Sequence, residues 1–118
     1  MSLDNLSGMG IVNPSMRKKL NQNKADITDM LKAVLVEYVK ATKAGQPTFT
    51  KNMFTDAPAL GVAVGRLEML MMICGSPISQ PVLASMCKTW ASGGLSEDAM
   101  SADNLIRLEA FYRQRRNG

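Results

Sequence analysis

Arginine and aromatic side chains cluster at the end of the chain, in the sequence LEAFYRQRRNG. Arg113, Arg115 and Arg116 directly follow two adjacent aromatic residues. Guanidinium groups bind phosphates and an exposed ring stacks on an unpaired base, so these residue types suit a contact with single-stranded nucleic acid. A structural interpretation stays open beside it. Arginines at the C-terminal end of a helix are favoured by the helix dipole, and Glu109 is placed to pair with Arg113 one turn later.

A second basic cluster lies near the start of the chain. Residues 1–25 hold four basic side chains against one acidic residue, Asp4, whereas residues 26–100 hold six basic and seven acidic ones. The net charge of +4 therefore comes from the two ends, which suggests a polyanionic or acidic partner. The candidate nucleic-acid-binding residues are Arg17, Lys18, Lys19, Lys24, Arg107, Phe111, Arg113, Arg115 and Arg116.

Combinations of side chains that could catalyse a reaction are scarce. The chain has no histidine, which excludes Ser-His-Asp and Cys-His sites and removes the commonest general base. Ser85 and Lys88 have the Ser-x-x-Lys spacing of some acyl-transfer enzymes, but the companion motifs are absent and Ser85 falls inside an expected helix. Phosphate-binding glycine loops and calcium loops are absent as well. We therefore expect a protein that is not an enzyme and has no cofactor and no small-molecule substrate.

The two cysteines, Cys74 and Cys87, do not form a close pair of the metal-ligand type. A zinc site would need carboxylates to complete it, because histidine is missing, so we expect no metal. No signal peptide is visible in the sequence. We therefore expect both thiols to be reduced and the protein to be cytoplasmic or otherwise intracellular, with virion association left open.

Apolar residues recur at helical spacing along most of the chain. From Asp26, which is expected to cap the helix, to Lys43, they lie on one expected helix face: Ile27, Leu31, Val34, Leu35, Tyr38 and Ala41. Further helices are expected after a cap at Asp56 up to Gly75, and after a cap at Ser79 up to Gly93 and Gly94. A last helix either runs continuously from Ser96 or follows a short turn and is capped by Ser101. Between the first two helices, Phe49 and Phe54 are expected to plug the core.

No segment alternates with the period of two that a strand requires, so the predicted fold class is all-α. We expect a compact bundle of four to five helices preceded by an extended or flexible N-terminal arm. The arm is residues 1–25, in which one short turn near Pro14–Leu20 is the regular structure to expect, and the single helical domain is residues 26–118. The chain has ten methionines, most of which should fill the core.

Small residues recur every four positions at Ala57, Gly61 and Gly65. Glycine costs a helix about 1 kcal/mol relative to alanine, so this stripe predicts a neighbouring helix packed close to the backbone, within the chain or in an oligomer. The charged residues Arg66 and Glu68 lie in the middle of the same helix and argue against a membrane span.

Residues 80–84 resemble the start of a helix-turn-helix motif. Aligning Ala84 with the small residue of that motif places Gly94 and Glu97 at positions that should be buried and apolar. Two core requirements of the motif therefore fail. Recognition of a DNA sequence through a helix-turn-helix is thus a minor alternative.

The stretch from LMMICGSPISQPVLASMC to LEAFYRQ resembles the helical C-terminal domains of filovirus and pneumovirus transcription cofactors. The likeness covers about half of the chain and consists of a leucine-rich helix, a Ser-Gln start, a Leu-x-x-x-Cys helix and an aromatic-bearing helix. The zinc-binding segment of those proteins is missing here, and we transfer no functional residue from them.

These observations favour a non-enzymatic helical module that contacts RNA or single-stranded DNA through its basic ends and self-associates, as in a viral or phage nucleocapsid-associated protein. The alternative is a protein-protein adaptor or virion assembly component without a nucleic-acid contact. A third possibility is a DNA-binding transcriptional regulator. A steep dependence of binding on salt would mark either nucleic-acid function, and a preferred duplex would mark the regulator.

Overall fold

A computed structural model of the chain describes residues 14–117, and every regular element in this range is helical. The elements are α1 (Pro14–Gln22), α2 (Lys24–Lys43), α3 (Met53–Asp56), α4 (Pro58–Ile73), α5 (Gln80–Ala91), the 3₁₀ turn η2 (Glu97–Ala99) and α6 (Ala102–Asn117). The all-α fold class is thus confirmed. Six α-helices occur in residues 14–117, where the sequence predicted four or five.

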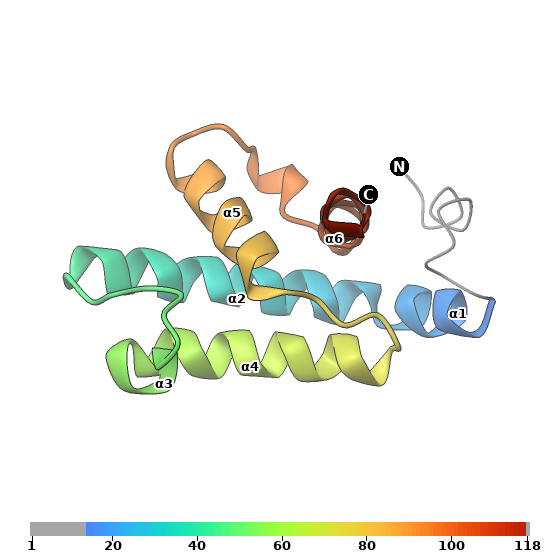
Figure 1. Ribbon diagram of the computed structural model, residues 1–118, viewed down its shortest axis with the longest axis horizontal. Coiled ribbons are helices and arrows are strands. Elements are labelled where there is room, and N and C mark those ends of the chain that lie inside the picture. The colour runs from blue at the N-terminus through green and yellow to red at the C-terminus, as the bar shows by residue number, and fades with distance from the viewer. Residues whose placement is uncertain (1–13, 118) are drawn as a thin grey trace.

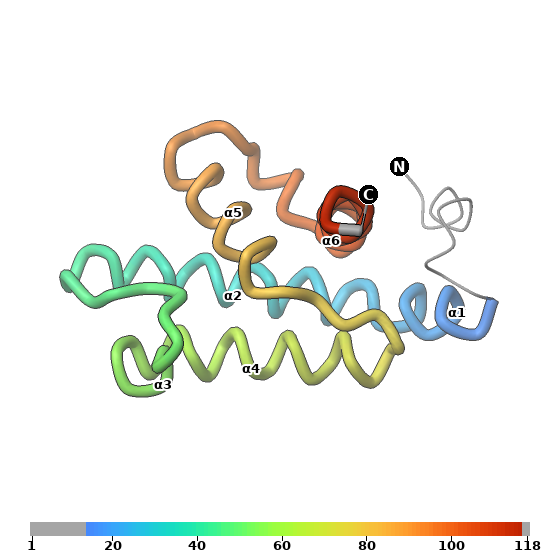
Figure 2. Tube along the Cα trace, in the orientation of Figure 1, coloured from blue at the N-terminus to red at the C-terminus, as the bar shows by residue number. Residues whose placement is uncertain are grey.

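Helix α2 is the centre of the molecule and contacts α1, α4, α5 and α6. Figures 1 and 2 show α2 and α4 side by side and antiparallel, with α5 and α6 on the opposite side of α2 and α6 seen end-on. The apolar face predicted for α2 is its buried face, from Ile27 to Ala41. Because this face meets several helices at once, α2 fixes the positions of α5 and α6.

The N-terminal segment is helical from Pro14, where an extended or flexible arm was expected up to residue 25. Leu20 of α1 is fully buried in the core, and α2 begins at Lys24, so Asp26 lies in the first turn and does not cap the helix. A nine-residue helix with one buried apolar side chain offers too little periodicity to be detected in the sequence. The rest of the expected arm, residues 1–13, lies outside the described residues.

The segment between α2 and α4 differs from expectation at two residues. Phe49 packs against the core, with its ring centroid 6.1 Å from that of Tyr38, as expected. Phe54 is 65% exposed and does not plug the core, because it lies on α3, outside α4. Asp56 ends α3 and accepts a hydrogen bond from Thr50 Oγ1 at 2.7 Å, so Ala57 takes the N-cap position of α4.

The start of α6 follows the second of the two alternatives. The turn η2 precedes it, and the hydroxyl oxygen of Ser101 accepts a hydrogen bond from the Asn104 N–H at 3.3 Å. Ser79 likewise stands at the N-cap position of α5, with Pro81 in the first turn. Gly75 follows α4 in the left-handed backbone region, at a φ of 78°, which glycine adopts without strain.

Helix α4 carries apolar residues on most of its circumference. Besides its buried face, it exposes a strip of large apolar side chains to solvent: Val62, Met69, Met72 and Ile73. We call these four residues the α4 strip. Within residues 14–117, no helix combines the length and the apolar character that crossing a bilayer would require.

Candidate nucleic-acid interface

The aromatic and arginine residues of the predicted site lie on the C-terminal half of α6, and the N-terminal half anchors them. The Ala102 N–H donates to Thr28 Oγ1 at 3.0 Å, and Asp103 pairs with Lys24 across 2.7 Å. Further along the helix, Leu105 and Ile106 are buried against the core. The first two turns of α6 are therefore fixed to α2. These contacts determine the direction in which the C-terminal half of the helix runs.

A buried carboxylate fixes the middle of α6 to the start of α5. Glu109 is 4% exposed and accepts a hydrogen bond from the Ser79 N–H, while its other oxygen lies 3.4 Å from Ser79 Oγ. Arg113 Nε lies 3.9 Å from Glu109, and the Arg113 guanidinium also donates to the carbonyl oxygen of Pro77. The expected Glu109–Arg113 pair is present within α6, its carboxylate is buried, and both residues also bond to the segment before α5.

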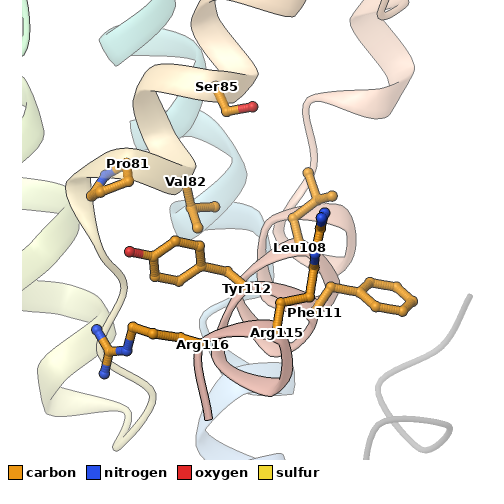
Figure 3. Close-up of a pocket in the computed structure, with 8 residues that line it drawn as sticks. All are labelled: Pro81, Val82, Ser85, Leu108, Phe111, Tyr112, Arg115 and Arg116. Carbon is orange, nitrogen blue, oxygen red and sulfur yellow. The ribbon is translucent and has the colours of Figure 1, made fainter. Parts of the chain in front are cut away.

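An apolar groove with two arginines at its edge runs between α5 and α6 (Figure 3). Its volume is about 520 Å³. We call it the α5–α6 groove, and its lining residues are Pro81, Val82 and Ser85 from α5 and Leu108, Phe111, Tyr112, Arg115 and Arg116 from α6. Three of the predicted nucleic-acid-binding residues, Phe111, Arg115 and Arg116, thus share one concave surface.

The two aromatic rings of the groove differ in orientation and exposure. Figure 3 shows the Tyr112 ring pointing toward Val82 and the Phe111 ring pointing away from α5. The guanidinium carbon of Arg116 lies 5.8 Å from the centroid of the Tyr112 ring, within the range of a cation–π contact. Phe111 is 47% exposed, so its ring is available to stack on a planar ligand. Arg115 extends from the same helix face toward Leu108 (Figure 3).

The other predicted basic residues are placed elsewhere or are already engaged. Lys24 holds Asp103, and Arg107 donates to Asn104 Oδ1 at a separate pocket about two turns before Arg115. Arg113 is bonded within the chain, and its side chain is 33% exposed. On α1, Arg17 is partly buried, whereas the two lysines that follow it are exposed.

Several residues of the groove were not predicted as site residues. Pro81, Val82 and Leu108 line the groove but are not among the residues predicted to bind nucleic acid. The apolar character of two of them agrees with their burial, because Val82 is 5% exposed and Leu108 packs against the core. Nothing in the sequence indicated that α5 lies beside α6, so the groove itself could not be predicted.

The small-residue stripe of α4 packs against α3 of the same chain. A Cβ placed on Gly61 would lie 3.1 Å from both the Cα and the N of Phe54, and a Cβ on Gly65 would lie 3.5 Å from Phe54 Cζ. Ala57 is buried at the junction of the two helices. The close neighbour expected at this stripe is therefore α3, and at Gly61 a side chain would meet the backbone of Phe54.

The cysteines lie inside the core, away from the groove. Burial raises the pKa of the Cys74 thiol, and it raises the pKa of Cys87 to about 12, so both are protonated and weakly nucleophilic at neutral pH. In the part of the chain that the structure describes, no three Cys, Asp or Glu side chains gather in a way that could hold a metal ion.

Comparison of the chain with family models, with curated protein sequences and with solved structures finds no match. The geometry of the chain itself is therefore the basis for inferring what it binds. Within residues 14–117, the α5–α6 groove is the place where an exposed ring, exposed arginines and a concave apolar surface occur together.

Proposed function

We propose that the protein binds RNA or single-stranded DNA at the α5–α6 groove and catalyses no reaction there. One observation carries this proposal. The half-exposed Phe111 ring lies with Arg115 and Arg116 at the edge of an apolar groove of about 520 Å³. An aromatic platform beside cationic side chains is the arrangement by which proteins bind single strands without reading a duplex.

The exposed ring favours a single strand over a duplex. Bases inside a helix are stacked on each other, and only an unpaired base can turn its face toward Phe111. Stacking of a base on an aromatic side chain contributes about 1–3 kcal/mol. Arg115 lies four residues after Phe111 and thus on the same face of α6, where it can contact the phosphate beside the stacked base.

Two of the basic residues predicted to contact phosphates are already paired with acidic residues of the chain. Lys24 and Arg113 have partners within the chain, in Asp103 and in Glu109, so their replacement should affect folding more than binding. Arg115 and Arg116 are exposed, and no side chain of opposite charge pairs with them in the described residues. They are the expected phosphate contacts of the groove.

Fluorescence anisotropy of labelled single-stranded RNA, single-stranded DNA and duplex DNA tests this proposal, at about 50 and 200 mM salt. We expect binding of both single strands that weakens severalfold with salt. Phe111→Ala should reduce affinity by roughly tenfold, which corresponds to about 1.4 kcal/mol. The double variant Arg115→Ala/Arg116→Ala should reduce both the affinity and its salt dependence.

The matched control is Lys51→Ala/Arg66→Ala, which also removes two exposed positive charges, neither of them at the groove, and should leave binding unchanged. Absence of binding at the lower salt would contradict the proposal. An equal loss of affinity in the control would show that net charge, and not the groove, attracts the strand. Preference for one duplex would instead support the DNA-binding regulator.

The α4 strip favours a second candidate function, self-association. Its four large apolar side chains are each at least 45% exposed, and identical strips on two copies can pair around a two-fold axis. The test is sedimentation velocity over a hundredfold range of concentration. Self-association through the strip predicts a dimer that Met69→Glu abolishes while leaving nucleic-acid binding at the groove intact.

A further inference from the structure

Helix α1 contacts the start of the loop between α4 and α5, residues 74–79. A Cβ on Gly75 would lie 3.1 Å from Cγ of Met16, and the Cys74 sulfur lies 3.9 Å from the carbonyl oxygen of Lys19. The positive charge of Lys19 opposes part of the rise that burial causes in the Cys74 pKa, in agreement with this contact. Helix α1, which carries Lys18 and Lys19, therefore lies beside residues 74 and 75.

The other end of the same loop contacts α6. Arg113 donates to the Pro77 carbonyl, and a cavity of about 120 Å³ lies at this contact. Its lining residues are Pro77, Ile78, Ser79, Glu109, Tyr112, Arg113 and Arg116. Tyr112 and Arg116 also line the α5–α6 groove, so the cavity and the groove meet at these two side chains. The groove is therefore adjacent to residues 77–79 of the loop.

The length of the loop suits a short single strand. Ser79 lies five residues after Cys74, so the loop spans at most about 18 Å. With a stacked rise of about 3.4 Å per nucleotide, a strand of at most about five nucleotides covers that distance. The acidic residue at the cavity, Glu109, is buried and bonded to Ser79 and Arg113, so it presents little negative charge to a phosphate.

We propose that a single strand of RNA or DNA bound at the α5–α6 groove continues across residues 74–79 to Lys18 and Lys19 of α1. Both basic segments then contact one strand, although about 95 residues separate them in the sequence. This inference rests on the proposed function of the groove. It extends that function by adding a second group of phosphate contacts, and it predicts that affinity grows with strand length until the strand reaches α1.

The test compares labelled oligouridines of three and of ten nucleotides by fluorescence anisotropy, with oligothymidines of the same lengths as the DNA arm. The variant is Lys18→Gln/Lys19→Gln, and the matched control is Lys32→Gln/Lys51→Gln, which removes two other exposed lysines. We expect the α1 variant to bind the ten-nucleotide strand severalfold more weakly than the control does. The slope of log K against log salt should fall in magnitude by about 1.4, as two lost single-strand contacts predict. Binding of the trinucleotide should stay equal to that of the control.

Equal binding of the ten-nucleotide strand by the α1 variant and the control would overturn this inference. An equal loss on both strand lengths would overturn it as well, because the lysines would then act through charge alone or through folding. With either result, the proposal that the groove binds a single strand still holds if Phe111→Ala weakens binding. If the unmodified protein binds neither length, or if the groove variants have no effect, the proposed function itself fails.

Discussion

Helices α4 and α6 are both sixteen residues long, and each leaves one side exposed, but the exposed sides differ in chemistry. The exposed side of α4 is the apolar α4 strip, with Arg66 as its neighbouring charge. The exposed end of α6 carries Phe111, Arg115 and Arg116. One helix thus offers a surface suited to another apolar surface, and the other offers a surface suited to a charged strand.

The two helices are also held in the molecule by different interactions. Leu60, Val64 and Leu67 of α4 are buried against its neighbours, so apolar packing holds this helix. The C-terminal half of α6 is held by Glu109, whose carboxylate bonds to the start of α5. The buried side chains of a helix thus determine where it lies in the fold. Its exposed side chains determine what kind of partner it can bind.

The largest effect should come from truncating the buried sides. Leu67→Ala in α4 and Leu105→Ala in α6 each remove a fully buried side chain and should each lower the free energy of unfolding by about 2–5 kcal/mol. Met69→Ala on the α4 strip should change it by less than about 0.5 kcal/mol. Urea unfolding followed by circular dichroism measures all three. A large cost for Met69→Ala that grows with protein concentration would show that the strip is already covered by a second copy.

Removal of the Glu109 carboxylate, which holds the C-terminal half of α6, should change the free energy of unfolding by an intermediate amount. Glu109→Ala leaves the Ser79 N–H and the Arg113 guanidinium without this acceptor, and we expect a loss of about 1–3 kcal/mol in the free energy of unfolding. The control Glu97→Ala removes an exposed carboxylate and should have an effect below about 0.5 kcal/mol. Equal effects of the two variants would mean that the buried carboxylate contributes no more than a surface one.

The smallest effect should distinguish the two glycines of α4. Gly65→Ala adds a methyl group at an ordinary contact distance from Phe54 and should stabilise the fold by about 0.5–1 kcal/mol through helix propensity. Gly61→Ala places the same group against the backbone of Phe54 and should lose that gain or reverse it. Thermal unfolding of both variants is the measurement. A gain at Gly61 as large as that at Gly65 would mean that α3 moves away freely.

The sequence predicted the local features of the fold well and the contacts between distant segments poorly. The buried face of α2 and the capping position of Ser101 follow from patterns within a few residues. Helix α1 was predicted only as one short turn near Pro14–Leu20, because Leu20 is its one fully buried apolar residue and gives little helical periodicity. The burial of Glu109 depends on Ser79, thirty residues earlier, and no local pattern could indicate that contact.

The same distinction applies to the candidate site. Phe111, Arg115 and Arg116 were identified by residue type and lie together because they are neighbours on one helix. Lys24 and Arg113 were identified in the same way, yet each has a partner within the chain that only the packing of helices reveals. Counting basic residues in a sequence therefore overstates how many of them remain available to a ligand.

The division of α4 into a buried and an exposed side also has a consequence for chemical ageing. Peroxide converts an accessible methionine thioether to a polar sulfoxide, and burial protects the others. Met69 and Met72 are more than 60% exposed, whereas Met71 between them is fully buried. Among the methionines of residues 14–117, oxidative damage would therefore begin on the α4 strip and make that surface hydrophilic while the core stays intact. A stored sample would lose its apolar surface well before it lost its fold.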